Sequence, residues 1–319
     1  MAKKWRKRLA VVKLESTYGE GSADMAGATI IEAVMLEGGN PYAGNTVERE
    51  RMRQGLGAYE QINTGPYVER TIRVPLAGHT DPGEAPPYAP LLRACGLSET
   101  SGTGETSYQP VSDGYESAEI WWIEEGQVQH MTGVRGTAQI GSDSQSLPFI
   151  EFSLTGLYER TKAGGDASAA DTASQAKELP VNKQNTVASI DGHAACMASL
   201  SLELGNTVEY RGLVNCESIQ ITERAVTGST NIEAPDLATK DYFDAVESHN
   251  GVTLVPVSLT HKDASHNEIE ISGAQVQLSS ISPTENQGIM HYDLGLRFLP
   301  DGSADDDFTL TFRDATPAP

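Results

Sequence analysis

The sequence predicts a mainly β protein made of two tandem β-sandwich or small-barrel units, each with a short flanking helix. Short runs in which apolar and polar residues alternate indicate strands. The order of these runs (strand, Gly/Pro loop, short helix, further strands) occurs twice, at an offset of roughly 140–150 residues. Between the two halves, Ala163–Lys177 consists almost wholly of small and polar residues. We therefore expect a first unit over 1–162, a linker over 163–180 and a second unit over 181–319.

The first half contains the clearest alternation, in Phe149–Tyr158. Glu124-Glu125-Gly126 marks the turn of a hairpin. Because Trp121 and Trp122 are adjacent in a predicted strand, we expect one to face a core and the other solvent or a partner. The other predicted strands of this half are Val68–Leu76, Glu116–Ile123, Gln127–Gly133 and Val134–Ile140. Val11–Glu15 alternates weakly, and Thr29–Leu36 is rich in Ile, Val and Met.

Loops and a helix separate these strands. Prolines make Gly78–Pro87 irregular, and apolar residues at helical spacing predict a helix over Tyr88–Cys95, which Gly96 terminates. Asn45–Ile62 is polar and charged, and its pattern fits either a charged strand ribbon or a short helix. Gly102–Gly114 is polar and turn-rich.

The second half repeats the order. Ser218–Thr222 leads into a predicted loop over Gly228–Pro235 and a predicted helix over Thr239–Val246. Gln129–Ile140 resembles Glu268–Ile281 in pattern, just as Phe149–Tyr158 resembles Met290–Leu299. The other predicted strands are Val187–Ile190, Ala198–Leu204, Val208–Val214, Val252–Thr260, Ile269–Leu278, Met290–Phe298 and Phe308–Phe312.

The charge of the chain argues against a nucleic-acid-binding enzyme. The formal net charge is -21 and the pI is near 4.6, whereas firm binding to nucleic acid depends on Lys and Arg at the phosphates. An acidic wall would repel DNA and so let it slide past without adhering. The alternative is that the charge serves only solubility.

Cysteine usage and hydropathy limit other classes. The three cysteines (Cys95, Cys196 and Cys216) show no C-x-x-C spacing, and we expect buried, reduced thiols. No apolar stretch approaches the ~20 residues that span a bilayer. The basic N-terminus is not followed by the apolar segment of a signal peptide. We therefore expect folding in a cytosol and no membrane association.

The sequence contains no recognisable catalytic constellation. It lacks G-x-S-x-G, H-E-x-x-H, a P-loop and a dinucleotide-binding motif. His261 and His266 flank Asp263 in a predicted turn, for which solvent exposure is a better interpretation than metal binding. Asp301–Asp307 resembles a calcium loop but lacks the required glycine, and Phe312 replaces the final carboxylate. We predict no catalytic residues, cofactor or metal, and hence a protein that is not an enzyme.

Three segments occur in an order that is known from one family. Lys13–Gly19 places a lysine and a glutamate before Thr-Tyr-Gly, and Glu48-Arg49-Glu50 forms a charged run. Val74–Gly78 continues through Ala85–Leu97 as a strand, a Gly/Pro loop and a short helix that ends in Cys-Gly-Leu. Over about residues 11–160, the chain resembles the major tail tube proteins of long-tailed (siphovirus-like) bacteriophages.

This resemblance implies a structural virion protein that is assembled in the host cytoplasm into the tail. It implies stacked rings around a channel through which DNA passes without specific binding, and a tape measure protein and a tail terminator as partners. Family members usually carry one tube-type unit and form hexameric rings. Because this chain carries two predicted units, three chains would close a pseudo-sixfold ring, with a homohexamer as the alternative.

Subunit contacts are expected from three segments: a basic N-terminal arm that reaches an acidic neighbour, a charged ribbon, and the Gly78–Pro87 loop. A disordered tail is the alternative for the arm. The residues are Lys3, Lys4, Arg6, Lys7 and Arg8; Glu48, Arg49, Glu50, Arg51 and Arg53; and Gly78, Pro82, Pro86 and Pro87.

Two other functions fit the same patterns. One is a virion decoration protein or an adhesin-like tandem β-sandwich that acts as a binding module, which would explain the acidic, loop-rich surface. The other is the related tube-forming ring protein of a contractile or secretion apparatus, which would share the fold.

Overall fold

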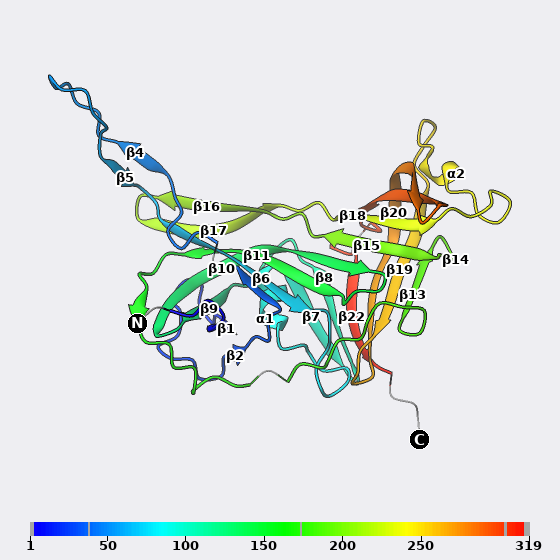
Figure 1. The fold of residues 1–319 in the computed structure, drawn as a ribbon, viewed down its shortest axis with the longest axis horizontal. Coiled ribbons are helices and arrows are strands. Elements are labelled where there is room, and N and C mark those ends of the chain that lie inside the picture. Colours follow the sequence, from blue (N-terminus) through cyan, green and yellow to red (C-terminus); the bar gives the residue numbers. More distant parts are fainter. Residues whose placement is uncertain (1–2, 38, 173, 303–304, 316–319) are drawn as a thin grey trace.

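The computed structural model describes residues 3–37, 39–172, 174–302 and 305–315. Strands dominate the described chain, which confirms the mainly β prediction, and two short helices, α1 (Ala89–Ala94) and α2 (Phe243–Val246), accompany them (Figure 1). Neither of these helices is long and apolar enough to cross a membrane.

The first half of the chain contains β1 (Arg8–Leu14), β2 (Thr29–Ile30), β3 (Met35–Glu37), β4 (Thr46–Glu48), β5 (Gln61–Asn63), β6 (Tyr67–Pro75), β7 (Leu97–Gly102), β8 (Glu105–Pro110), β9 (Ala118–Glu124), β10 (Gln127–Asp143), β11 (Phe149–Leu157) and β12 (Lys162–Ala163). The second half contains β13 (Thr186–Ile190), β14 (His193–Ala194), β15 (Met197–Glu203), β16 (Thr207–Leu213), β17 (Cys216–Glu223), β18 (Thr227–Glu233), β19 (Leu254–Lys262), β20 (Asn267–Asn286), β21 (Ile289–Phe298) and β22 (Thr309–Asp314).

Antiparallel pairing joins strands of both halves. We use the name central sheet for the series β3-β6-β11-β10-β15-β18-β21-β20, in which each strand pairs with the next. β9 connects β10 to β1, and β19 connects β20 to β13. β22 pairs with both β20 and β8, so the halves meet through two separate ladders, β10–β15 and β22–β8.

The core lies on one face of the central sheet. Its main cluster combines first-half side chains such as Phe152 with second-half side chains such as Leu202 and Phe312, all buried. Trp122 belongs to this cluster, and Trp121 is buried in a smaller cluster with Val11. The expectation that one tryptophan would be exposed is wrong, because β9 is covered on both faces.

Several predicted elements need correction. The two strands expected over Gln127–Gly133 and Val134–Ile140 are the single strand β10, which carries a register shift at the positive-φ residue Gly133. The loop expected over Gly228–Pro235 is mostly the strand β18, and the turn-rich Gly102–Gly114 contains β8. The helix expected over Thr239–Val246 is only the single turn α2.

Asn45–Ile62 forms a ribbon rather than a helix, with β4 paired to β5. Figure 1 shows this ribbon projecting away from the body of the molecule. Cys95 is buried as expected, but Cys196 and Cys216 are exposed free thiols, which corrects the prediction of burial for those two.

Candidate assembly interfaces

The central sheet has one polar face. Two rows of directly opposed residues cross it: Arg73, Glu151, Gln139, Glu203, Thr227 and Arg297 form the first row, and Asp143, Ser199, Asn231, Asp293 and Ser282 form the second. We call these two rows the polar face. It is net acidic, because it carries four carboxylates and only two guanidinium groups. One of these, Arg73, pairs with Glu151 at 2.5 Å. The opposite face of the same strands supplies the core.

The ladder between β10 and β15 is the joint between the halves on this sheet, and we call it the internal joint. It pairs Ile140 with Leu202 and Ser142 with Leu200. Two further main-chain bonds extend it, from Ser144 N to the carbonyl of Ala198 (2.7 Å) and from Leu204 N to that of Ala138 (3.0 Å). The buried leucines of β15 thus continue the apolar face of β10.

The ribbon β16–β17, which we call the second ribbon, also crosses the joint. Arg135 of β10 donates to the carbonyl of Ile219 at 2.6 Å. Its guanidinium carbon lies 4.6 Å from the ring centroids of both Tyr18 and Tyr115. The Tyr115 hydroxyl donates to the carbonyl of Ile221 at 3.0 Å. Burial lowers the pKa of Arg135, and the neighbouring Tyr18 and Tyr115 oppose this effect. The second ribbon is therefore fixed to the first half.

The ribbon β4–β5, which we call the first ribbon, has no such support in the described chain beyond its base, where Tyr67 stacks on Tyr210 of the second ribbon. Along the rest of the ribbon, Arg49 pairs with Glu60 at 3.1 Å, and the Arg53 guanidinium lies 4.7 Å from the Tyr59 ring centroid. At its tip, Met52 and Leu56 are fully exposed. Apolar side chains this exposed are typical of a surface that a partner covers. Glu48, Glu50 and Arg51, also named from the sequence, are exposed on the same ribbon.

The basic arm lies against its own chain. Lys4 N donates to the Glu125 carboxylate at 2.5 Å, and Lys7 Nζ lies 3.0 Å from the same carboxylate. These partners lower the pKa of Glu125. Arg8 opens β1, and its guanidinium lies 3.7 Å from the Trp5 ring centroid. The described part of the arm contacts the β9–β10 turn. Contact with a second copy stays a prediction, for which the exposed Lys3 and Arg6 are the available side chains.

The Gly78–Pro87 loop packs inside the chain. Gly78 N donates to Asp263 Oδ2, and Gly83 N donates to Asn267 Oδ1, each at 2.9 Å. Gly78 and Pro86 are buried, whereas Pro82 and Pro87 are partly exposed. Any contact with a second copy is left to the exposed part of the loop, and this too stays a prediction.

The turn that follows β19 corrects another expectation. Asp263 is buried and accepts main-chain N–H groups from Gly78, Ser265 and Asn267, as well as the Asn267 side-chain amide. His261 is buried too, with Nδ1 2.8 Å from the Thr186 hydroxyl. The expected solvent exposure is therefore wrong for His261 and Asp263, whereas Ala264 and His266 in the turn are exposed. No group of side chains suited to a metal ion occurs in the described part of the chain.

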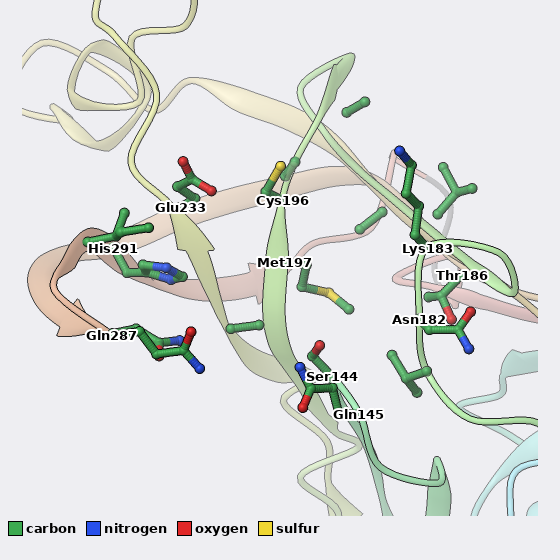
Figure 2. Close-up of a pocket in the computed structure, with 18 residues that line it drawn as sticks. Ser144, Gln145, Asn182, Lys183, Thr186, Cys196, Met197, Glu233, Gln287 and His291 are labelled. Carbon is green, nitrogen blue, oxygen red and sulfur yellow. The ribbon is translucent and has the colours of Figure 1, made fainter.

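A cavity of about 780 Å³ lies between the β20–β21 turn and the strands β13 to β15. Figure 2 shows that His291 and Gln287 lie on one side of it and Lys183 and Asn182 on the other, with Met197 between them. His291 is already bonded to Asn231 (2.7 Å). The polar groups do not converge on a common point, as a catalytic site requires.

Two strand edges of the central sheet are open, and sequence reasoning missed both. β3 pairs with β6 on one side, and no described strand lies on its other side. β20 pairs with β21 through Asn286, but its ladder to β19 ends at Gln277. The signal that could have revealed one edge is Pro283, since a proline inside a strand is typical of an edge.

Open strand edges offer unpaired main-chain groups to another chain, as in proteins that assemble through their sheets. The family model described as phage tail tube protein matches residues 5–312. The chain therefore belongs to the phage tail tube protein family, which makes it a non-enzymatic component of a virion tail and confirms the resemblance. A comparison with curated proteins gives no match.

Proposed function

We propose that this chain is the major tail tube subunit of a long-tailed phage, and that it polymerises as stacked rings around a channel for DNA. Family membership supports self-assembly into a tube. The proposal adds two tube-type units, over 1–162 and 181–319, joined by a linker over 163–180. It also adds three chains per ring with pseudo-sixfold symmetry, and a tape measure protein and a tail terminator as partners.

The order of strand pairing in the two halves supports the duplication. β1–β9, β3–β6, β6–β11 and β9–β10–β11 in the first half correspond to β13–β19, β15–β18, β18–β21 and β19–β20–β21 in the second. A two-stranded ribbon interrupts each series at the same point, β4–β5 between β3 and β6 and β16–β17 between β15 and β18. A short helix also lies at the same point within each series, α1 after β6 and α2 after β18.

The residue-by-residue register of these ladders is the main support for the duplication, because one set of equivalent residues holds from each strand to the next. Met35 opposite Arg73 corresponds to Ser199 opposite Asn231, because the residues that follow them, Leu36 and Leu200, both pack against the core. Counting two residues on makes Pro75 equivalent to Glu233. Their partners on the next strands are Phe149 and His291, which are followed by the core residues Ile150 and Tyr292. This moves the alignment expected from the sequence, which placed Phe149 with Met290, by one residue. Matching residue for residue over several ladders is unlike the chance similarity of two β-sheets.

The polar face supports the channel. The rest of each strand's surface is occupied by the core, so this face is the one that a closed ring would turn toward a lumen. Hydroxyls, amides and a net excess of carboxylates offer DNA few attractive groups, and the carboxylates repel its phosphates. DNA would then pass without specific binding.

The rotational symmetry of an isolated ring tests this proposal. Electron microscopy and native mass measurement of the purified protein should give three chains per ring, with six similar lobes in projection. Six chains per ring would overturn the duplication and make the second half an elaboration of one unit. Monomers alone, at every protein and salt concentration, would overturn the tube.

A further inference from the structure

We propose that neighbouring copies in a ring are joined by the two open edges, with β20 of one copy pairing antiparallel with β3 of the next. The register places Thr284 opposite Glu37, Glu285 opposite Leu36 and Asn286 opposite Met35. The external joint so formed repeats the internal joint. This inference rests on the proposed function, because it requires rings of this chain.

The register follows from the equivalences between the halves. Phe149 and His291 are equivalent, and their partners on the adjacent long strands are Gly141 and Thr284. In the internal joint Gly141 lies opposite Ser201. Ser199 is equivalent to Met35, so Ser201 is equivalent to Glu37. Thr284 of the second half is therefore equivalent to Gly141 of the first half. In the external joint, Glu37 of the next copy takes the place that Ser201 has in the internal joint.

Hydrogen-bonding alternation on β20 agrees with this register. Phe298 N donates to the carbonyl of Val226 (3.1 Å) and Ala234 N to that of Met290 (3.0 Å). The even-numbered residues of β21 therefore direct their main-chain groups toward β18, and the odd-numbered ones toward β20. Because odd-numbered His291 lies opposite Thr284, the main-chain groups of the next residue, Glu285, face the open edge.

The same alternation applies on β3. In the internal joint, Ser144 N donates to Ala198, so Ala198 and Leu200 direct their main-chain groups toward β10. Leu36 is equivalent to Leu200 and faces the open edge of β3. Glu285 and Leu36 then form a pair that exchanges two N–H···O bonds, one in each direction. The hydrogen-bonding alternations of β20 and β3, which come from opposite ends of the chain, therefore match in this register.

Pro283 also faces the open edge, since it lies two residues from Glu285. Its missing N–H removes one donor from the external joint but no bond from the ladder to β21. A proline on an edge discourages pairing with unrelated strands. Its position fits an edge that must stay unpaired in a free chain and accept only one partner.

Exposed apolar side chains lie at both edges. Val34, beside β3, is 65% exposed, and Ile289, in the turn after β20, is 51% exposed. By the register above, Val34 of the next copy would lie opposite Gln287 and next to this turn. Burial of both side chains against a second copy would remove apolar surface that a free chain leaves in water.

Cross-linking tests the register. In a Cys196→Ser, Cys216→Ser background, Thr284→Cys and Glu37→Cys are made as two separate proteins, so that a disulfide between them is necessarily intermolecular. Neither residue donates to the external joint, and such pairs have Cα atoms about 4.5 Å apart, within disulfide range. Mixed tubes, once oxidised, should give disulfide-linked dimers in at least fivefold excess over Thr284→Cys mixed with Met35→Cys, which lies two residues out of register.

The wild-type chain separates the two hypotheses. If it forms no tubes, the proposed function fails. If it forms tubes but the Thr284→Cys and Glu37→Cys mixture is no better cross-linked than the out-of-register mixture, the joint is wrong while the tube stands. Hydrogen exchange on the unmodified chain gives a second measure: the amides of Leu36 and Glu285 should exchange at least tenfold more slowly in tubes than in free chains. Unchanged exchange at both amides would overturn the joint.

Discussion

The rings of Tyr67 and Tyr210 stack with their centroids 5.2 Å apart and their planes inclined by 27°. Tyr67 begins β6 at the base of the first ribbon, and Tyr210 lies on the second ribbon. The Tyr210 ring also lies over Gly65, where an added Cβ would come within 2.9 Å of it. The two ribbons therefore meet in one chain, although about 140 residues separate these tyrosines.

Tyr210→Ala should loosen the second ribbon without unfolding the protein. Loss of the stacked pair should lower the free energy of unfolding by about 1 kcal/mol. Amides of β16 and β17 should exchange faster, as measured by hydrogen exchange with mass spectrometry. Tyr59→Ala removes a tyrosine from the first ribbon and serves as the control, since it should leave exchange in the second ribbon unchanged.

Arg135→Met should destabilise the whole fold. The substitution leaves the carbonyl of Ile219 without its donor and removes the cation from between Tyr18 and Tyr115. We expect the free energy of unfolding to fall by about 2–3 kcal/mol in urea titrations. Arg73→Met, on the solvent-facing polar face, should cost under about 1 kcal/mol. Equal losses for the two variants would contradict the anchoring role of Arg135.

Asp263→Ala should also destabilise, because several N–H groups lose their shared acceptor in a buried turn. We expect a loss of about 3 kcal/mol in denaturant unfolding, with a smaller loss for Asp263→Asn, which keeps one oxygen. Asp81→Ala in the neighbouring loop is the control, since that side chain is 83% exposed. A loss below about 1 kcal/mol for Asp263→Ala would show that water replaces the carboxylate.

His261 should make stability depend on pH. Burial lowers its pKa below the usual value of 6.5, and the nearby Asp263 opposes this effect only in part. As the pH falls below 6.5, the unfolded chain binds a proton that the folded chain resists, so the free energy of unfolding decreases. His261→Gln should flatten the stability profile between about pH 7.5 and 5.5. The exposed His266, replaced in the same way, should leave the slope as it is in the wild type.

Charge reversal of the basic arm should weaken assembly and leave the fold intact. Lys3→Glu with Arg6→Glu changes two exposed side chains and preserves the Lys4 and Lys7 contacts with Glu125. Tubes measured by electron microscopy should be shorter or absent, because an acidic neighbour would repel the arm. Arg160→Glu with Lys177→Glu makes the same change in net charge at exposed sites elsewhere. Tubes of normal length from the arm variant would show that the arm has no role in assembly.

The sequence could predict the strands that have one buried face. Phe149–Tyr158 and Ala198–Leu204 alternate because the core covers one side of β11 and β15. Gly228–Pro235 could not be assigned in this way, because Gly, Ser, Thr and Asn are typical of turns. Glycine is required at position 228 because the main chain lies close to β15 there. An added Cβ would approach the carbonyl oxygen of Ser201 to 2.5 Å. Tertiary pairing, rather than local preference, makes this segment a strand.

The assembly surfaces were less accessible to sequence reasoning. Charge drew attention to the arm and the first ribbon, whereas open edges are defined by strands that are missing beside them. The repeat was visible as a pattern, but its register depends on which residues oppose one another across ladders such as β18–β21. No local signal specifies a partner so far along the chain.

Ile140 and Pro283 occupy equivalent places on their strands, yet their circumstances before any assembly differ. Ile140 is buried in a joint that forms as the chain folds, so its edge never meets other proteins. Pro283 lies on an edge that a freshly made chain exposes to a crowded cell, where an unprotected strand invites aggregation. Joining two units in one polypeptide therefore halves the number of exposed edges that need a protective residue such as Pro283. It also lets the two equivalent positions carry different side chains.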